Sequence, residues 1–200
     1  MSTATNVTAQ AVNTIEWLSA SGTTIVVPVY QRQYRWDIGG CEKLLADVRA
    51  VAASNDAHTH FIGSILSSES TAVTTGPDDV AELVLIDGQQ RITTLMLLVA
   101  ALHHTVRADN PVLAAELERV LVRASDPHRT KLRPHRAWAE VFEKVVLEKT
   151  GEHEARDSRF DDNYAFFRSQ IRADEVAHIW RGLQKLEHVA ITLGPGANAQ

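Results

Sequence analysis

The sequence Asp87-Gly88-Gln89-Gln90-Arg91 combines residue types suited to binding and hydrolysing a phosphate ester. It stands between an apolar, strand-like run at 82–86 and a helical pattern that begins near Ile92. A glycine at this junction lets the backbone turn, and the helix N-terminus adds N–H donors and the positive end of its dipole. We expect the side chain of Asp87 to cap the helix, and Arg91 to supply a fixed charge that matches phosphate oxygens.

The polar residues at this turn could complete a site for nucleotide hydrolysis, which needs charge neutralisation, positioning and a polar group on the attacking water. Gln89 and Gln90 could orient that water or contact a base edge. Thr93 or Thr94 could contact a phosphate or a metal-bound water. The plain alternative is a capped helix with a solvated arginine, which leaves the paired glutamines and threonines without an obvious use.

A second cluster interleaves aromatic rings with arginines between Val27 and Trp36. Such a mixture suits a nucleic-acid backbone, with stacking or cation–π contacts, or a nucleotide pocket. The alternative, which the spacing alone favours, is an edge loop whose rings pack into the core and whose arginines are solvated. The candidate DNA contacts here are Pro28, Tyr30, Gln31, Arg32, Tyr34, Arg35 and Trp36.

A third candidate is the run from His128 to Arg136, which carries four fixed positive charges and no acid. Arg129, Lys131 and Arg133 could contact DNA phosphates, and a solvated turn between helices explains the run equally well. The net charge of −5 argues against a non-specific nucleic-acid coat but allows a local basic groove.

Few residues suggest a metal site or a special compartment. His58 and His60 could bind a metal ion on one strand face, but no third metal-binding residue is nearby, so we predict no metal site. The single cysteine, Cys41, excludes a disulfide framework and a cysteine-rich zinc site. The chain has no apolar run of roughly 18 residues and no secretory signal, so we expect a cytoplasmic protein.

The hydrophobic pattern predicts an α+β fold with a small mixed sheet and a central helix after the Asp87–Arg91 turn. We expect a flexible segment at 1–12, a core at 13–110 and a helical extension at 111–200, cut short of a longer protein. Turn-rich residues 71–79 are expected to form a hairpin tip. The predicted strands are 24–29, 61–66, 82–86 and 188–193, and the predicted helices are 40–53, 92–106, 112–121, 138–146, 164–171 and 176–183.

Three motifs in series resemble a known family: VPVYQRQYRW at 27–36, FIGSI at 61–65 and LIDGQQRITTL at 85–95. In this order they are similar to the DGQQR domain of bacterial anti-phage defence, over residues 14–193. That domain is the amino-terminal part of GmrSD-type restriction enzymes and of the SspE-like effectors that sense phosphorothioated DNA.

The resemblance implies a ParB/sulfiredoxin-like core that hydrolyses a nucleoside triphosphate, GTP or ATP, with Mg²⁺. Hydrolysis would take place at Asp87–Arg91, and double-stranded DNA would be sensed through Tyr30, Gln31, Arg32, Tyr34 and Arg35. It also implies a carboxy-terminal nuclease domain, of which this chain has no histidine–asparagine motif. Two rivals remain, namely a nucleotide- or DNA-binding module without turnover, and a nuclease site at the Asp87–Arg91 turn.

Overall fold

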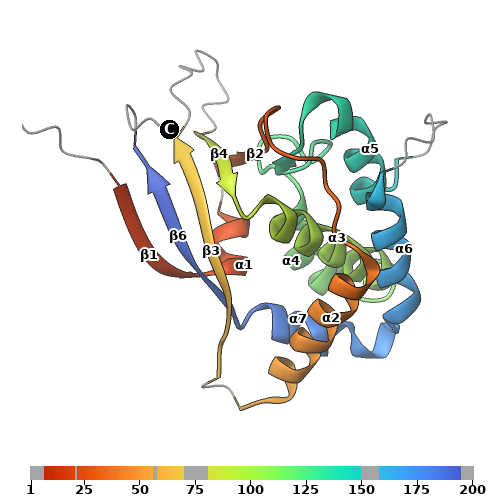
Figure 1. The fold of residues 1–200 in the computed structure, drawn as a ribbon. Coiled ribbons are helices and arrows are strands. Elements are labelled where there is room, and N and C mark those ends of the chain that lie inside the picture. The colour runs from red at the N-terminus through yellow and green to blue at the C-terminus, as the bar shows by residue number, and fades with distance from the viewer. Residues whose placement is uncertain (1–6, 21, 56–57, 70–80, 150–157, 195–200) are drawn as a thin grey trace, which may run out of the picture.

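The computed structural model describes residues 7–20, 22–55, 58–69, 81–149 and 158–194 and confirms the α+β fold. Its centre is a six-stranded mixed sheet with helices gathered on one side, as Figure 1 shows. The predicted hairpin tip at 71–79 lies outside the described residues. In spatial order the strands are β1 (Val7–Asn13), β6 (Leu186–Leu193), β3 (His60–Glu69), β4 (Ala81–Asp87), β2 (Thr23–Val26) and β5 (Leu132–Arg133).

The pairing of the strands places β4 in the interior of the sheet, with β2 beside Ala81–Val84 and β3 beside its last residues, up to Asp87. β4 runs antiparallel to β3 and parallel to β2, so it has a neighbour on each side. β6 runs parallel to β3 and antiparallel to β1. A turn that leaves the end of β4 therefore starts from a rigid frame.

All six predicted helices are present, with ends shifted by a few residues. Asp37 caps the first of them, because its side chain accepts a hydrogen bond of 2.8 Å from the N–H of Gly40. No helix among the described residues is long and apolar enough to cross a membrane. The helices are α1 (Thr14–Ser19), α2 (Ile38–Ala53), α3 (Gln89–Val106), α4 (Pro111–Leu121), α5 (Arg136–Leu147), α6 (Arg159–Gln170) and α7 (Val176–Leu183).

Helix α3 is the centre of the core, as its sequence predicts. Every residue from Leu95 to Leu102 is fully buried, because the helix carries apolar side chains on all faces. It packs against α4, α5, α6 and α7 and stands beside the sheet in Figure 1. The Asp87–Arg91 turn thus joins an interior strand to a buried helix, and this fixes where its side chains point.

Three elements were not expected from the sequence. Residues 7–13 form β1, where a flexible segment was predicted, and they pair along their whole length with β6. Helix α1 and the two-residue strand β5 are also additional. Although the run at 82–86 is apolar, only Leu85 is fully buried in β4, while Leu83 and Val84 are partly exposed. The division at residue 110 stays a prediction, although β6 joins the sheet from beyond it.

Candidate functional site

The turn before α3 is made by Gly88, whose φ of 94° lies in the left-handed region that favours glycine. Gly88, and not Asp87, occupies the N-cap position, and no side chain caps the helix. The expected capping role of Asp87 is therefore wrong, because the turn leaves this carboxylate exposed at the end of β4. The first helical hydrogen bond runs from the N–H of Ile92 to Gly88. Among the described residues, nothing accepts from the N–H groups of Gln89, Gln90 and Arg91.

The guanidinium of Arg91 is held against the sheet. Its Nη1 donates to the carbonyl of Ser64 at 3.1 Å. Gly63, with a φ of 100°, lies directly beneath it, since a Cβ at Gly63 would come within 3.1–3.3 Å of the guanidinium atoms. The strand pairing shifts register between Phe61 and Ser64, so a bulge in β3 makes this space. No carboxylate among the described residues forms an ion pair with Arg91.

The two glutamines hold the loop at 27–37 across the start of α3. The Nε2 of Gln89 donates to the carbonyl of Arg32 at 2.9 Å. Gln90 makes two bonds, accepting from the N–H of Arg35 at 2.8 Å and donating to the carbonyl of Gln33 at 3.2 Å. One hydrogen bond at each end of the amide fixes the position of the Gln90 side chain. Its expected role of orienting a water stays a prediction, because the amide keeps one N–H and one acceptor position for a further partner.

Gln31 adds a fourth bond between the loop and this turn. Its Nε2 donates to the carbonyl of Ile86, at the end of β4, at 2.6 Å. The Oε1 of Gln89 has no hydrogen-bond partner among the described residues, so it can contact a ligand without breaking a bond to the loop.

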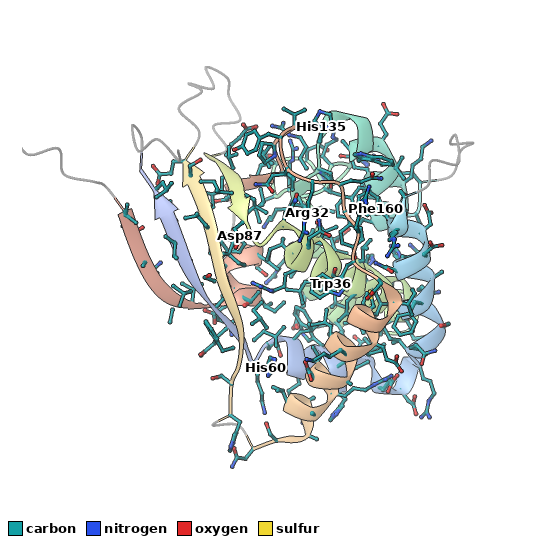
Figure 2. The ribbon with its side chains drawn as sticks, viewed as in Figure 1. Arg32, Trp36, His60, Asp87, His135 and Phe160 are labelled. Atoms are coloured by element: carbon teal, nitrogen blue, oxygen red, sulfur yellow. The ribbon has the colours of Figure 1, made fainter. Side chains whose placement is uncertain are left out.

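Loop and turn together enclose a cavity of about 360 Å³, which we call the arginine cavity. This size lies within the roughly 300–1,000 Å³ typical of small-molecule sites. Its wall carries three arginines and one carboxylate, although the chain as a whole has a net charge of −5. Figure 2 shows Asp87, Arg32 and Trp36 around this region. The residues that line it are Gln31, Arg32, Arg35, Trp36, Asp87, Gly88, Gln89, Gln90 and Arg91.

Thr93 and Thr94, near the start of α3, do not line the arginine cavity. The hydroxyl of Thr93 donates to the carbonyl of Gln89, and its side chain lines a different cavity. Thr94 is fully buried and bonded to the hydroxyl of Tyr34 at 2.8 Å. The expected phosphate contact of Thr94 is wrong, because this hydroxyl serves the core.

The loop at 27–37 divides into an exposed tip and buried anchors. Val29 and Tyr30 are 69% and 71% exposed, and Arg32 and Arg35 are also exposed. Gln31 and Pro28 are half-buried. The tip therefore presents one aromatic ring, one aliphatic side chain and two guanidinium groups to solvent.

The anchors are Tyr34 and Trp36. Tyr34 stacks on Phe160 at 5.1 Å, and its hydroxyl accepts from Asn163 at 2.8 Å. Burial raises the pKa of Tyr34 well above its usual range. Trp36 packs over Gly40, where a Cβ would overlap its indole. The expected DNA contact through Tyr34 is therefore wrong, whereas Trp36 is partly exposed and lines the arginine cavity.

Two of the arginines in the basic run at 128–136 are paired with carboxylates but remain accessible to solvent, so their expected contacts with DNA phosphates stay predictions. Arg129 pairs with Glu143 at 2.9 Å and Arg133 pairs with Glu82 at 2.6 Å. Lys131 is 3% exposed. The expected DNA contact through Lys131 is wrong, because its ammonium is buried and donates to backbone carbonyls. These are Ala20 at 2.9 Å and Arg119 at 3.2 Å, and burial lowers the pKa of Lys131 to about 8.

Comparison with known proteins gives the family. The model of the GmrSD restriction endonuclease N-terminal domain matches residues 15–194. The chain belongs to this family. Among curated proteins, none matches it significantly. As a GmrSD N-terminal domain, the chain is a module of a restriction effector, and both the turn and the loop lie within the matched residues.

This GmrSD N-terminal domain has a buried histidine within the electrostatic reach of Arg91 that the sequence did not reveal. His188 on β6 is fully buried, its Nδ1 lies 3.0 Å from the hydroxyl of Thr14, and its Nε2 has no partner among the described residues. Burial, and secondarily the charge of Arg91, lowers the pKa of His188 to about 4. The alternating pattern of β6 gave no reason to single it out.

The other histidines do not form a metal site in the described part of this GmrSD N-terminal domain. No group of three potential ligands from histidine, cysteine or acidic residues comes together there. His58 bonds to Asn55. His104 is buried against the hydroxyl of Tyr164, at 2.7 Å, so it is a satisfied core histidine.

Proposed function

We propose that the arginine cavity binds and hydrolyses a nucleoside triphosphate, GTP or ATP. The observation that carries this proposal is the convergence on one cavity of three arginines and the first turn of α3, whose three N–H groups have no partner in the described part of the chain. Helix N-termini and arginines are the two commonest protein partners for phosphate oxygens. A triphosphate matches the excess of positive charge in the cavity wall.

Within this cavity Arg91 is the group best placed to stabilise charge on a transferring phosphoryl group. It is held by Ser64 and by the bulge at Gly63, so it needs no rearrangement when charge develops. Arg32 and Arg35 approach from the loop, on the opposite wall. Arg91 would therefore act as a fixed donor, and the loop arginines would hold the remaining phosphate oxygens.

Magnesium fits this cavity as part of the substrate. Mg²⁺ is usually bound by one or two carboxylates together with substrate phosphates. Asp87 supplies one carboxylate in the cavity wall, and it is exposed. Asp87 would hold the ion that accompanies the triphosphate, and the ion would neutralise phosphate charge there.

We also propose that the loop tip senses double-stranded DNA, including its phosphorothioate form. Tyr30 and Val29 offer apolar surface beside Arg32. Sulfur is larger and more weakly hydrated than the oxygen it replaces, so it favours such a surface, while the arginine holds the charge. Since four hydrogen bonds tie the loop to the turn before α3, a DNA contact at the tip acts on the frame of the arginine cavity.

A second candidate is a module that binds nucleotide without turning it over. The engagement of Gln90 at both ends favours it, because this side chain already holds the loop and is not free to turn toward an attacking water. The two candidates share the binding site and differ in whether phosphate is released.

Phosphate release distinguishes these functions. GTP or ATP with Mg²⁺ is supplied to the wild type and to Arg91→Ala, with plain duplex, phosphorothioate duplex or no DNA. Arg172→Ala is the matched control, since Arg172 is exposed and pairs with Asp174 away from the cavity. Stimulated release that is lost only in Arg91→Ala supports hydrolysis. Binding without release supports the second candidate, and nicking of the duplex without nucleotide would indicate a nuclease site.

The sensing role has its own test. Tyr30→Ala should reduce the preference for phosphorothioate duplex more than it reduces binding to plain duplex. Equal losses on both duplexes would contradict sensing by this ring.

The remaining proposals follow from family membership together with the motifs. We propose that this is an SspE-like member with a ParB/sulfiredoxin-like core, that it works in the cytoplasm, and that it controls a nuclease domain carried elsewhere in its protein. The series of motifs at 27–36, 61–65 and 85–95 supports these assignments. DNA cleavage by the complete protein, dependent on nucleotide and on modified DNA, is the test.

A further inference from the structure

A second cavity of about 130 Å³ lies on the other side of the 27–37 loop, and we call it the aromatic cavity. Its wall is formed by the loop, by α3 and by residues of the α5 and α6 regions. Figure 2 shows Arg32 between Asp87 on one side and His135 and Phe160 on the other. The lining residues are Val27, Val29, Gln31, Arg32, Gln33, Tyr34, Gln89, Gln90, Thr93, Pro134, His135, Trp138 and Phe160.

The two cavities are neighbours. Gln31, Arg32, Gln89 and Gln90 line both of them. A ligand whose phosphates lie against the α3 N-terminus can therefore extend past Arg32 into the aromatic cavity without leaving the surface of the domain. On its way such a ligand passes the side chains that hydrogen-bond the loop to α3.

The chemistry of the aromatic cavity differs from that of the arginine cavity. Among the described residues that line it there is no carboxylate, and Arg32 carries the one permanent charge. Phe160 and Trp138 meet edge to face, with ring centroids 6.5 Å apart and planes at 83°. Apolar walls with a few polar groups are typical of sites for flat ring systems.

Two polar groups stand at the edge of this apolar wall. The ring of His135 has no hydrogen-bond partner among the described residues, and it makes no cap for α5. The Oε1 of Gln89 is likewise unpartnered there. At the edge of a planar base the His135 ring can donate or accept a hydrogen bond, and the Oε1 of Gln89 can accept one. The guanidinium of Arg32 can stack on the face of the base.

We propose that the aromatic cavity binds the nucleobase of the triphosphate whose phosphates occupy the arginine cavity. This inference rests on the proposed function, because it assigns the ring of the same ligand. Its small volume suits one ring system and excludes a complete second nucleotide. The ribose then lies beside Arg32, between the two cavities.

Tryptophan fluorescence tests the assignment, since Trp36 lines the arginine cavity and Trp138 lines the aromatic one. GTP, ATP and sodium tripolyphosphate are titrated into the wild type, Trp36→Phe and Trp138→Phe. The nucleotides should quench emission in Trp36→Phe but lose most of this effect in Trp138→Phe. Tripolyphosphate should leave the emission of Trp36→Phe unchanged. Equal responses to nucleotide and tripolyphosphate in Trp36→Phe would overturn the inference.

Affinity provides the second readout. In calorimetry, Trp138→Ala should bind GTP about five- to a hundredfold more weakly than the wild type, as expected for loss of a stacking partner. His135→Ala should show a smaller loss of GTP affinity. Tripolyphosphate affinity should be unchanged in both. His135→Ala keeps the test valid if Trp138→Ala fails to fold, because His135 is partly exposed.

The outcomes separate the inference from the function beneath it. If neither tripolyphosphate nor nucleotide binds the wild type, the proposed function itself fails. If both bind equally well and neither variant alters nucleotide affinity, only the nucleobase assignment fails. Loss of affinity for a duplex with an unpaired, extrahelical base, without loss for free GTP, would also overturn it and assign the cavity to DNA.

Discussion

Replacement of Gln90 by leucine should release the 27–37 loop from α3 while the core stays folded. Leucine has a similar size but cannot bond to the N–H of Arg35 or to the carbonyl of Gln33, at 2.8 and 3.2 Å. Each such bond contributes about 0.5–1.5 kcal/mol net, so the pair contributes roughly 1–3 kcal/mol to keeping the loop closed. The opening equilibrium should then shift by about 5- to 150-fold.

Native-state hydrogen exchange measures this shift directly. The amide of Arg35 should exchange faster by the factor above, whereas amides in the buried middle of α3, near Leu97, should keep their protection. Because the effect is local, the change in Tm should stay below the roughly 2–4 °C per kcal/mol that a global loss would produce.

A matched control and a clear contradiction are available. Gln170→Leu replaces an exposed side chain that bonds, among the described residues, to the neighbouring Ser169 alone, and it keeps the backbone carbonyl that accepts from Arg49, so it should change neither the loop nor Tm. Unchanged exchange at Arg35 in Gln90→Leu would show that Gln90 does not hold the loop. Phosphate release should also fall in Gln90→Leu, since Arg35 would no longer be fixed at the cavity.

Three further predictions follow from the same contacts. Gly63→Ala should displace the Arg91 guanidinium and weaken tripolyphosphate binding, with a stability cost of about 1–3 kcal/mol for the positive φ; unaltered binding would contradict the positioning of Arg91. His188 has a pKa of about 4 when folded against 6.5 when unfolded, so the unfolded state binds more protons between these values. The free energy of unfolding should fall by up to about 3 kcal/mol as pH drops from 6.5 to 4. Denaturant titrations of His188→Gln should show a smaller fall. The same dependence on pH in the variant and the wild type would contradict this role of His188. Lys131→Met should lower stability but leave the salt dependence of DNA binding unchanged. Arg32→Ala should reduce the slope of log K for DNA binding against log salt concentration by about one. The reverse pattern would show that Lys131, and not Arg32, contacts DNA.

Much of the fold could be predicted because its elements have strong periodic signals. The apolar faces of α2 and α3 and the β-branched strands are visible in sequence, and the break at Asn110 and Pro111 ends one helix and starts the next. The strand at 7–13 was missed because its burial is slight, and only its pairing with β6 makes it a strand.

The site was harder to predict because side-chain roles depend on contacts between distant segments. The sequence indicated that Asp87–Arg91 and Val27–Trp36 have functional roles, but not that the two segments line the same cavity. The sequence suggested Gln90 as a group that orients a water, but it gave no sign of the hydrogen bonds that Gln90 makes with residues more than fifty positions away. Lys131 looked like a surface charge within a basic run, and its burial depends on two backbone carbonyls from other elements.

The most direct test of the account is calorimetry of tripolyphosphate with the folded domain. The wild type and Arg172→Ala should bind it with equal affinity, and Arg91→Ala should bind at least tenfold more weakly, because it loses the one arginine fixed at the start of α3. Equal affinity in all three proteins would show that the phosphate chain binds elsewhere, and it would contradict the assignment of the arginine cavity.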